Sequence, residues 1–241
     1  YDYGLITTKS YDTSTAVRDI AMLGNRVAMA VSMQNGCGNL EILEAELGPD
    51  KCLAARVISG FEIIAPGEIK ITVSADAIHI GGAAGGETHQ SAETLAGLIA
   101  AAGHPATAVA DIRQSLFAKL LYNCALNPLG AILGVHYGVL AERRETRIIM
   151  DSVIDETFAV ITAIGVKTPW QHADEYKAFF YAELIPATYD HRPSMLQDLE
   201  NNKPTEVESL IGYVSSTGRL FDVQTPACDL LANLIRFKQS Q

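Results

Sequence analysis

Basic residues are scarce in this sequence, and they form no cluster. Lys and Arg total 18 against 28 Asp and Glu, which gives a formal net charge of −10. Binding to nucleic acid or to an anionic membrane needs concentrated Lys and Arg, because the phosphate charges must be neutralised. The composition therefore argues against nucleic acid and membrane as partners, and the acidity favours solubility.

Metal-ligand motifs and disulfide frameworks are also missing. The four cysteines form no CxxC pair, and the six histidines form no HExxH motif. A chain of 241 residues, 48% of them hydrophobic, can build a core without cross-links. We therefore expect no metal, and four small buried thiols in a reducing compartment.

The opening residues do not have the pattern of a secretory segment. No uninterrupted apolar run reaches the roughly 20 residues that span a bilayer, so we expect a cytoplasmic protein. The chain begins YDYGLITTKS without an initiator Met, and Tyr3 to Thr8 already has the pattern of a strand. We interpret the sequence as starting in the middle of a fold.

The first 110 residues alternate strand-like and helix-like patterns. YGLITTK and VAMAVSM are typical of strands, and the second is a continuous apolar run, as in buried parallel strands. TAVRDIAMLG and LEILEAELG have helical periodicity and end at a glycine. AARVISGFEIIA, GEIKITVS and AIHIGG predict a meander of pairing strands, and SAETLAGLIAAAG predicts a helix capped by Ser91.

From about Asp111 onward, strand patterns nearly vanish. Helical periodicity covers residues 112–126, 139–164, 172–184, 194–200, 205–220 and 226–238. The sequence therefore predicts two domains, an α/β domain over residues 1–110 and an all-helical domain over residues 111–241.

A polar stripe interrupts the apolar segment LFAKLLYNCALNPLG. Lys119, Asn123 and Asn127 are four residues apart, and four residues advance a helix by about 400°, so all three lie on one face. A buried Lys is costly unless it is paired, and Asn is a poor residue in mid-helix. The alternative is a Lys that reaches solvent while the asparagines cap neighbouring chain ends. Pro128 predicts a helix break or kink directly after Asn127.

The chemistry of this stripe suits a small carbonyl compound that carries a carboxylate. A partly desolvated Lys has a lowered pKa and can give a proton to an oxygen that becomes negative during reaction. Asn amides donate to carboxylates and accept from hydroxyls. Lys119 with two asparagines therefore predicts a site that binds and protonates such a compound.

Other candidate residues lie in two loops and near one helix start. Asn35 is in MQNGCGN, which follows a predicted strand, and Lys9 follows the first predicted strand. Ligands bind at the carboxyl ends of parallel strands, although MQNGCGN also fits an ordinary turn. Ser194 and Glu206 lie in RPSMLQDLENNKPTEVESLIGYV, where KPTEVE is expected to open a helix. Glu206 also fits an ordinary first-turn acid.

Together these motifs resemble the ketopantoate reductase (2-dehydropantoate 2-reductase) family. In order, they are TTKSYDT with Lys9, QNGCGN with Asn35, K-x-x-x-N-x-x-x-NP with Lys119, Asn123 and Asn127, SMLQD with Ser194, and PTEVESLIG with Glu206. The resemblance implies the C-terminal part of a Rossmann-type dinucleotide-binding domain followed by a helical domain. It also implies that NADPH delivers a hydride to ketopantoate, giving (R)-pantoate for pantothenate and coenzyme A synthesis.

The resemblance further implies a role for each residue. Lys119 would be the general acid at the carbonyl oxygen, and Glu206 would orient Lys119 or the substrate hydroxyl. The substrate-binding residues would be Asn35, Asn123, Asn127 and Ser194. The cofactor-binding residues would be Lys9, Asn35 and Glu206. The helical domain would form a homodimer.

The sequence departs from the family at its start. The family's opening strand and GxGxxG turn, which cradles the pyrophosphate, are not found here, so about 70 residues are expected ahead of Tyr1. GGAAGG, residues 81–86, follows a meander strand and is interpreted as a loop. KPTE differs from the family's usual linker. Two alternatives stay open: a reductase of another small branched 2-keto acid, and a non-catalytic dinucleotide-binding or dimerisation module.

Overall fold

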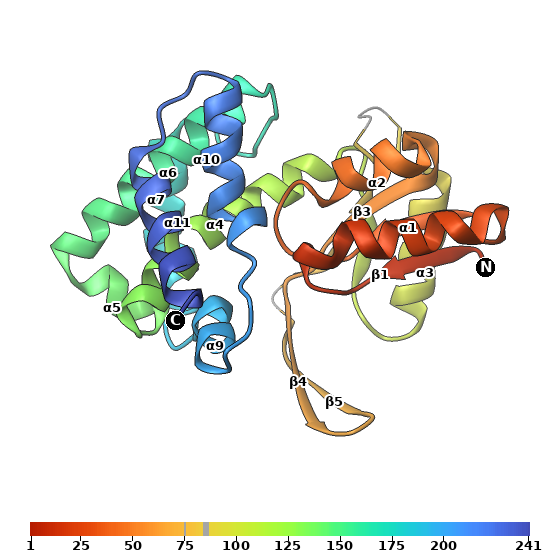
Figure 1. The fold of residues 1–241 in the computed structure, drawn as a ribbon, viewed down its shortest axis with the longest axis horizontal. Coiled ribbons are helices and arrows are strands. Elements are labelled where there is room, and N and C mark those ends of the chain that lie inside the picture. Colours follow the sequence, from red (N-terminus) through yellow and green to blue (C-terminus); the bar gives the residue numbers. More distant parts are fainter. Residues whose placement is uncertain (75, 84–86) are drawn as a thin grey trace. The chain divides into compact units, whose positions relative to one another are not determined.

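The computed structural model describes residues 1–74, 76–83 and 87–241, which fold as two compact units. The units are Tyr1–Leu116 and Phe117–Gln241, and the boundary between them falls inside helix α4 (Ile112–Leu133). Figure 1 shows strands only in the first of these units. The loop expected at residues 81–86 is described only at its start, since residues 84–86 lie outside the described residues.

A five-stranded sheet with the order β1-β2-β3-β6-β7 forms the centre of the first unit. Its strands are β1 (Tyr3–Ile6), β2 (Met29–Ser32), β3 (Cys52–Arg56), β6 (Ile78–Gly81) and β7 (Ala106–Ala108). β1, β2 and β3 are mutually parallel, whereas β6 is antiparallel to β3 and parallel to β7. Ile6 lies beside Ser32, so the loops that follow β1 and β2 leave the sheet at the same level.

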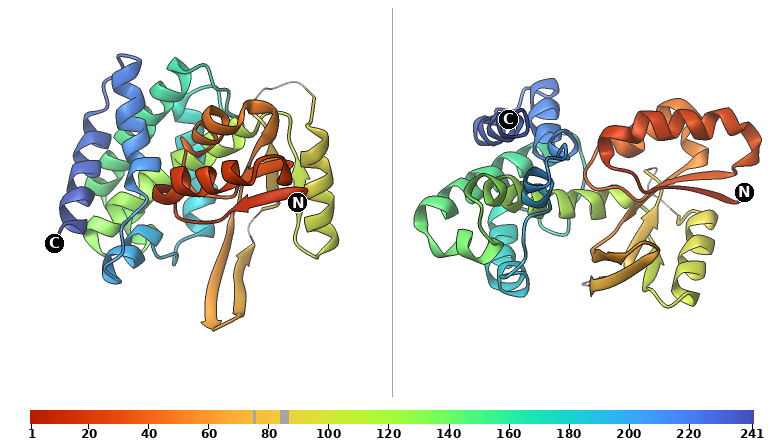
Figure 2. Two further views of the ribbon diagram at one scale, coloured as in Figure 1. Left: turned by 45° about the vertical axis from the view of Figure 1, so that its right-hand side comes forward. Right: turned by 60° about the horizontal axis from the view of Figure 1, so that its bottom comes forward.

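Helices cover both faces of this sheet because alternate strand residues point to opposite sides. The helices are α1 (Thr13–Leu23), α2 (Asn39–Leu47) and α3 (Gln90–Ala101). Cys52 and Ala54 pack in one core with Val17 of α1, whereas Leu53 packs in a second core with Leu95 of α3. Figure 2 shows α1 and α3 on opposite sides of the strands.

The expected meander is only partly present. β4 (Ser59–Ala65) and β5 (Glu68–Ser74) form a separate antiparallel hairpin, which projects from the rest of the first unit in Figures 1 and 2. AARVISGFEIIA contains two strands, because its start belongs to β3 and its end to β4. β3 is buried along its whole length and follows α2 as the last strand of a parallel crossover, so tertiary pairing decides its place.

The second unit is built from helices throughout its described length. After α4 come α5 (Tyr137–Glu142), α6 (Arg144–Ala163), α7 (Ala173–Phe179), α8 (Ile185–Ala187), α9 (Ser194–Glu200), α10 (Ile211–Leu220) and α11 (Pro226–Gln239). A 3-10 turn at Val207–Ser209 and a π-helical turn at Phe180–Leu184 also belong to this unit. In the first unit, short 3-10 turns lie at Ser10–Asp12, Gly24–Arg26 and Pro49–Lys51.

Several helix boundaries differ from the sequence expectation, and two of the differences have a clear local cause. The pattern over 139–164 forms two helices, because Arg143 between them has an extended backbone. α3 begins at Gln90, and its cap is His89, not Ser91: the His89 ring nitrogen Nδ1 accepts a hydrogen bond from the backbone N–H of Ser91 at 3.1 Å. The His89 imidazole therefore caps this helix in place of the Ser91 hydroxyl that the sequence predicts.

Among the described residues, one helix, α4, is long and apolar enough to cross a membrane by length and composition. Its most apolar stretch has a mean hydropathy of 1.3, and 67% of that stretch is buried inside the protein. A long core helix of a soluble protein has these same properties. The burial follows from packing, since Leu120, Leu121, Leu126 and Leu129 are all buried.

Candidate functional site

In the first unit, the candidate residues lie in the loops after two parallel strands. Lys9 ends the loop after β1, and its carbonyl accepts the N–H of Asp12 at 3.0 Å as the chain enters a 3-10 turn. Asn35 lies in the loop after β2, and its backbone carbonyl accepts a hydrogen bond from the side-chain nitrogen Nδ2 of Asn39 at 2.9 Å. Gly38 precedes α2 with a φ of 92°, a conformation that favours glycine. Both loops therefore lie at the carboxyl ends of adjacent strands, as predicted from the sequence.

A buried glutamine that sequence reasoning missed connects these loops. Gln34 is 7% exposed. Its Nε2 donates to the carbonyls of Thr8 (3.1 Å) and Lys9 (3.2 Å), and it lies 2.9 Å from Thr13 Oγ1. Its Oε1 accepts a hydrogen bond from Ser32 Oγ at 3.0 Å. The one signal in the sequence is a glutamine directly after a buried apolar strand.

In the second unit, α4 carries the polar stripe along one helix face. Asn123 and Asn127 are 7% and 4% exposed, and Lys119 is half-buried. Of the break or kink predicted after Asn127, the break is wrong, because α4 continues through Pro128 to Leu133. Buried leucines before and after the proline, such as Leu126 and Leu129, hold the helix by packing, and this offsets the one hydrogen bond that Pro128 cannot make.

The structure brings Asn127 and Ser194 together. Asn127 Oδ1 accepts hydrogen bonds from the backbone N–H of Met195 at 3.2 Å and from Ser194 Oγ at 3.3 Å. Asn127 therefore satisfies a free N–H in the first turn of α9. This is the capping alternative of the sequence analysis, and it leaves the amide nitrogen of Asn127 as its donor.

Asn123 differs from Asn127 in its surroundings. Within the part of the chain that the structure describes, its amide has no side-chain hydrogen-bond partner, although the residue is 7% exposed. A buried polar group normally has a partner, because losing water without replacing its hydrogen bonds is costly. The Asn123 amide is therefore available to a ligand.

Glu206 is buried, at 6% exposure, and its backbone is firmly held. Its carbonyl accepts the N–H groups of Ser209 and Leu210, both at 3.2 Å. The preceding Thr205 donates through Oγ1 to Gln239 Oε1 at 2.8 Å, which ties this segment to α11. KPTEVE opens a 3-10 turn first, and α10 begins only at Ile211.

The four cysteines, Cys37, Cys52, Cys124 and Cys228, are free and buried, as expected. Burial, with the Glu44 carboxylate nearby, raises the pKa of Cys52 to about 11, and burial raises the pKa of Cys124 well above its usual range. These two thiols are protonated at neutral pH and are poor nucleophiles. Among the described residues, no group of three or more His, Cys, Asp or Glu side chains is placed to hold a metal ion.

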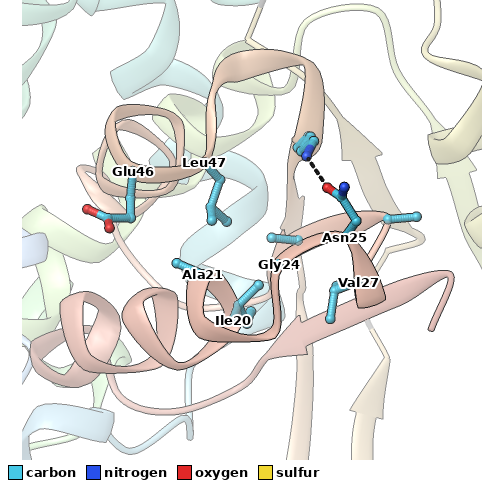
Figure 3. Close-up of a pocket in the computed structure, with 10 residues that line it drawn as sticks. Ile20, Ala21, Gly24, Asn25, Val27, Glu46 and Leu47 are labelled. Atoms are coloured by element: carbon cyan, nitrogen blue, oxygen red, sulfur yellow. Dashed lines mark hydrogen bonds between the residues drawn. The ribbon is translucent and has the colours of Figure 1, made fainter.

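A cavity of about 200 Å³ lies in the first unit, at the end opposite the loops that hold Lys9 and Asn35 (Figure 3). It lies where α1 and α2 end, between apolar side chains such as Ile20 and Leu47, and a hydrogen bond of 3.4 Å from Lys51 Nζ to Asn25 Oδ1 crosses its edge. None of the residues predicted from the sequence lines it. The cavity thus lies apart from the loops that hold Lys9 and Asn35.

The first unit, with parallel strands, helices on both faces and polar loops at the carboxyl ends, has the architecture of a dinucleotide-binding domain, and a helical unit follows it. Two family models match the chain: "Ketopantoate reductase PanE/ApbA" over residues 1–85, and "Ketopantoate reductase PanE/ApbA C terminal" over residues 111–239. The chain belongs to the ketopantoate reductase family, a family of oxidoreductases.

Individual relatives agree with this assignment. The 2-dehydropantoate 2-reductase of Aquifex aeolicus is 39% identical over 238 residues, which is 99% of this chain and 76% of that protein. The crystal structure of a PanE/ApbA family ketopantoate reductase from Ralstonia eutropha JMP134 matches with a TM-score of 0.86 and 29% identity, over 99% of this chain and 76% of that one. A D-mandelate dehydrogenase solved with NADH and anilino(oxo)acetate shares the fold, with a TM-score of 0.87, 23% identity, and coverage of 100% and 77%.

Proposed function

We propose that this protein is a cytoplasmic, NADP-dependent 2-dehydropantoate 2-reductase that reduces ketopantoate to (R)-pantoate. The observation that carries the proposal is the half-buried Lys119 on one helix face with the buried Asn123 and Asn127, in a chain of this family. A proton donor beside neutral hydrogen-bonding groups is the equipment that a carbonyl reduction needs. The 39% identity to a 2-dehydropantoate 2-reductase supports ketopantoate as the substrate.

The loops after β1 and β2 fit a nicotinamide cofactor. They lie at the carboxyl ends of parallel strands, and the backbone at Gly36 and Gly38, with φ of 82° and 92°, leaves no side chain between it and a ligand. Lys9, Asn35 and Glu206 would contact the cofactor, which supplies a hydride when bound. Lys9 also offers a positive charge that suits an anionic dinucleotide.

The residues of α4 and α9 provide for substrate binding and proton transfer. Lys119 Nζ gives a proton to the keto oxygen as that oxygen gains negative charge, and Glu206 orients Lys119 or the substrate hydroxyl. The buried amide of Asn123 binds the substrate, because its hydrogen-bonding capacity is not used within the described chain. Asn35, Asn127 and Ser194 complete the set of groups that hold the substrate.

Loss of nicotinamide absorbance on mixing full-length protein with NADPH and ketopantoate tests this function. Lys119→Ala is expected to lower kcat by about 10²- to 10⁴-fold, the usual contribution of a general acid, with cofactor affinity largely kept. Lys203→Ala, which removes an exposed Lys from the same unit, is the matched control and should leave kcat unchanged. Equal activity of the two variants would contradict the role of Lys119.

The same assay separates the alternatives. NADH run in parallel tests the preference for NADPH. Turnover only with other small branched 2-keto acids would keep the reductase class and change the substrate. Silence with every keto acid, together with measurable cofactor binding, would favour a non-catalytic dinucleotide-binding or dimerisation module.

An exposed apolar stripe on α11 supports a homodimer through the helical domain. Leu230, Leu234 and Phe237 are 60%, 39% and 63% exposed, and their spacing places them on one helix face. The opposite face is buried through Leu231 and Ile235, so α11 is apolar on two sides. A second copy of the chain would cover the outer stripe.

Light scattering of the eluting protein tests this assembly. Leu234→Lys should convert a dimer into a monomer, because a charge in the stripe would be buried without a partner. Leu98→Lys is the matched control, since Leu98 is a 58% exposed leucine on α3 of the other unit. A dimer that survives Leu234→Lys would place the interface elsewhere.

A further inference from the structure

The orientation of the buried Gln34 amide is fixed by its neighbours. The carbonyl oxygens of Thr8 and Lys9 lie 3.1 and 3.2 Å from one end of the amide, and carbonyls only accept hydrogen bonds, so this end is the nitrogen. The other end faces Ser32 Oγ at 3.0 Å. The position therefore needs a donor toward the β1 loop and an acceptor toward β2, which a neutral amide provides.

The hydrogen bonds continue from Gln34 to the loop of Asn35. Gln34 Nε2 lies 2.9 Å from the hydroxyl of Thr13, and that hydroxyl lies 2.8 Å from Asn39 Oδ1. The Asn39 nitrogen then donates to the carbonyl of Asn35 at 2.9 Å. Thr13 and Asn39 are 0% and 5% exposed, so the path is sheltered from water. Buried and well-connected polar groups of this kind rigidify what they join.

We propose that Gln34 is a positioning residue of the reductase, which holds the backbone of Lys9 so that the Lys9 side chain meets the cofactor. This inference rests on the proposed function, in which Lys9 and Asn35 contact the nicotinamide cofactor. Gln34 bonds to the carbonyl of Lys9 itself, and it is tied to β2 through Ser32. Small displacements of a binding group weaken its contacts, so a supporting residue of this kind sets how well the site is preorganised.

Gln34→Met tests the proposal, because Met has a similar length and donates no hydrogen bond. In the full-length protein, the Kd for NADPH, followed by its fluorescence, is expected to rise about tenfold, the loss that one to two hydrogen bonds would cause. The KM for ketopantoate at saturating NADPH should rise by a smaller factor than this Kd, because Gln34 bonds directly to the Lys9 carbonyl and reaches Asn35 only through Thr13 and Asn39. Gln90→Met is the matched control, because Gln90 is an exposed glutamine at the start of α3 in the same unit, and it should leave the Kd unchanged.

A double-mutant cycle with Lys9→Ala shows whether Gln34 acts through Lys9. If it does, Gln34→Met adds little once the Lys9 side chain is gone, so the double variant binds NADPH about as well as Lys9→Ala alone. Losses that multiply overturn the inference. Weak binding by Lys9→Ala with normal binding by Gln34→Met also overturns it, and leaves the proposed function intact. Normal binding by Lys9→Ala removes Lys9 from the proposed cofactor site and overturns both.

Gln34→Glu provides a readout that a merely structural role would not move. The carboxylate would face two carbonyl oxygens, so its protonated form is favoured and its pKa rises. Once protonated, the acid donates a hydrogen bond again. Cofactor affinity of this variant, relative to that of the natural protein, should therefore recover as the pH is lowered. The same relative affinity at every pH, in a variant whose thermal unfolding shows that it is folded, would contradict the proposal.

Discussion

Asn127 Oδ1 accepts the backbone N–H of Met195 at 3.2 Å and so joins the middle of α4 to the first turn of α9. Asn127→Leu removes this acceptor and leaves a buried N–H without a partner. We expect the free energy of unfolding to fall by about 1–3 kcal/mol, measured by urea denaturation. Asn127→Asp keeps an acceptor for Met195 and should recover part of this loss.

The same pair of variants separates the effect of Asn127 on stability from its effect on substrate binding. Asn127→Asp loses the amide N–H donors, so under the proposed function its KM for ketopantoate should rise even where its stability is recovered. A normal KM in Asn127→Asp would confine Asn127 to the support of α9. That outcome would leave Asn123, whose amide has no partner among the described residues, as the asparagine that contacts the substrate.

Local periodicity was enough to predict the main helices and the first two strands. α1, α2, β1 and β2 lie where their sequence patterns place them, because each pattern is a property of a short segment. β7, only three residues long, was not predicted, and β3 was merged with β4. A short strand is defined by the strand it pairs with, and that partner is distant in the sequence.

In the candidate site, too, a pattern within one segment could be predicted from the sequence, whereas a contact between distant segments could not. Helical spacing alone placed Lys119, Asn123 and Asn127 on one face of α4. The meeting of Asn127 with Ser194 joins residues 67 positions apart and has no periodic signal. Gln34 was missed for a related reason: its sequence neighbours are those of a turn, and only the folded backbone shows that the amide is buried between two loops.

A carboxylate caps helix α11 from outside the helix. Glu156 of α6 accepts the N–H of Ala227 at 2.9 Å and the N–H of Cys228 at 2.8 Å, one with each oxygen. The N–H groups of a first turn have no partner within their own helix, and a negative charge there is favourable. Glu156→Gln turns one acceptor into a donor, so we expect a loss of about 1 kcal/mol in urea denaturation.

Glu145→Gln is the control for this prediction, because Glu145 is an exposed acid at the start of the same helix. Its replacement should change stability by less than about 0.5 kcal/mol. If Glu156→Gln and Glu145→Gln were equally mild, the capping bonds would contribute little to the stability of the helical unit.

His79 gives the first unit a predictable response to acid. Its Nδ1 lies 2.8 Å from Ser115 Oγ. Burial, with the Arg56 guanidinium nearby, lowers its pKa below the ordinary 6.5, although Asp76 acts in the opposite direction. The folded protein thus binds this proton less readily than the unfolded chain. The stability that depends on neutral His79 is complete above pH 6.5 and is lost as the pH falls below it.

Asp76 extends this loss to lower pH. Burial alone would raise its pKa, but hydrogen bonds from Arg56 (2.8 Å) and from the N–H of Ala77 (2.8 Å) lower it below 3.8. The stability that Asp76 contributes is present above that value and disappears below it.

Urea denaturation tests the His79 prediction. The free energy of unfolding should be lower at about pH 5.5 than at about pH 7.5, and His79→Gln should reduce this difference. An unchanged drop in His79→Gln would assign the effect to other groups.

Gly81 ends β6 where the chain leaves no room for a side chain. A Cβ at this position would lie 2.4 Å from the backbone carbonyl oxygen of Val109, and backbone cannot move aside as a flexible side chain can. Gly81→Ala is therefore expected to destabilise the protein by about 1–3 kcal/mol, as overpacking usually does.

Gly97 offers the opposite case: it lies within α3, and a Cβ there would meet nothing within 4 Å. Gly97→Ala should stabilise the protein by about 0.5–1 kcal/mol, because alanine favours the helix. The two variants make the same chemical change in one unit, so urea denaturation should give shifts of opposite sign. Shifts of the same sign would show that local space does not decide the outcome at these glycines.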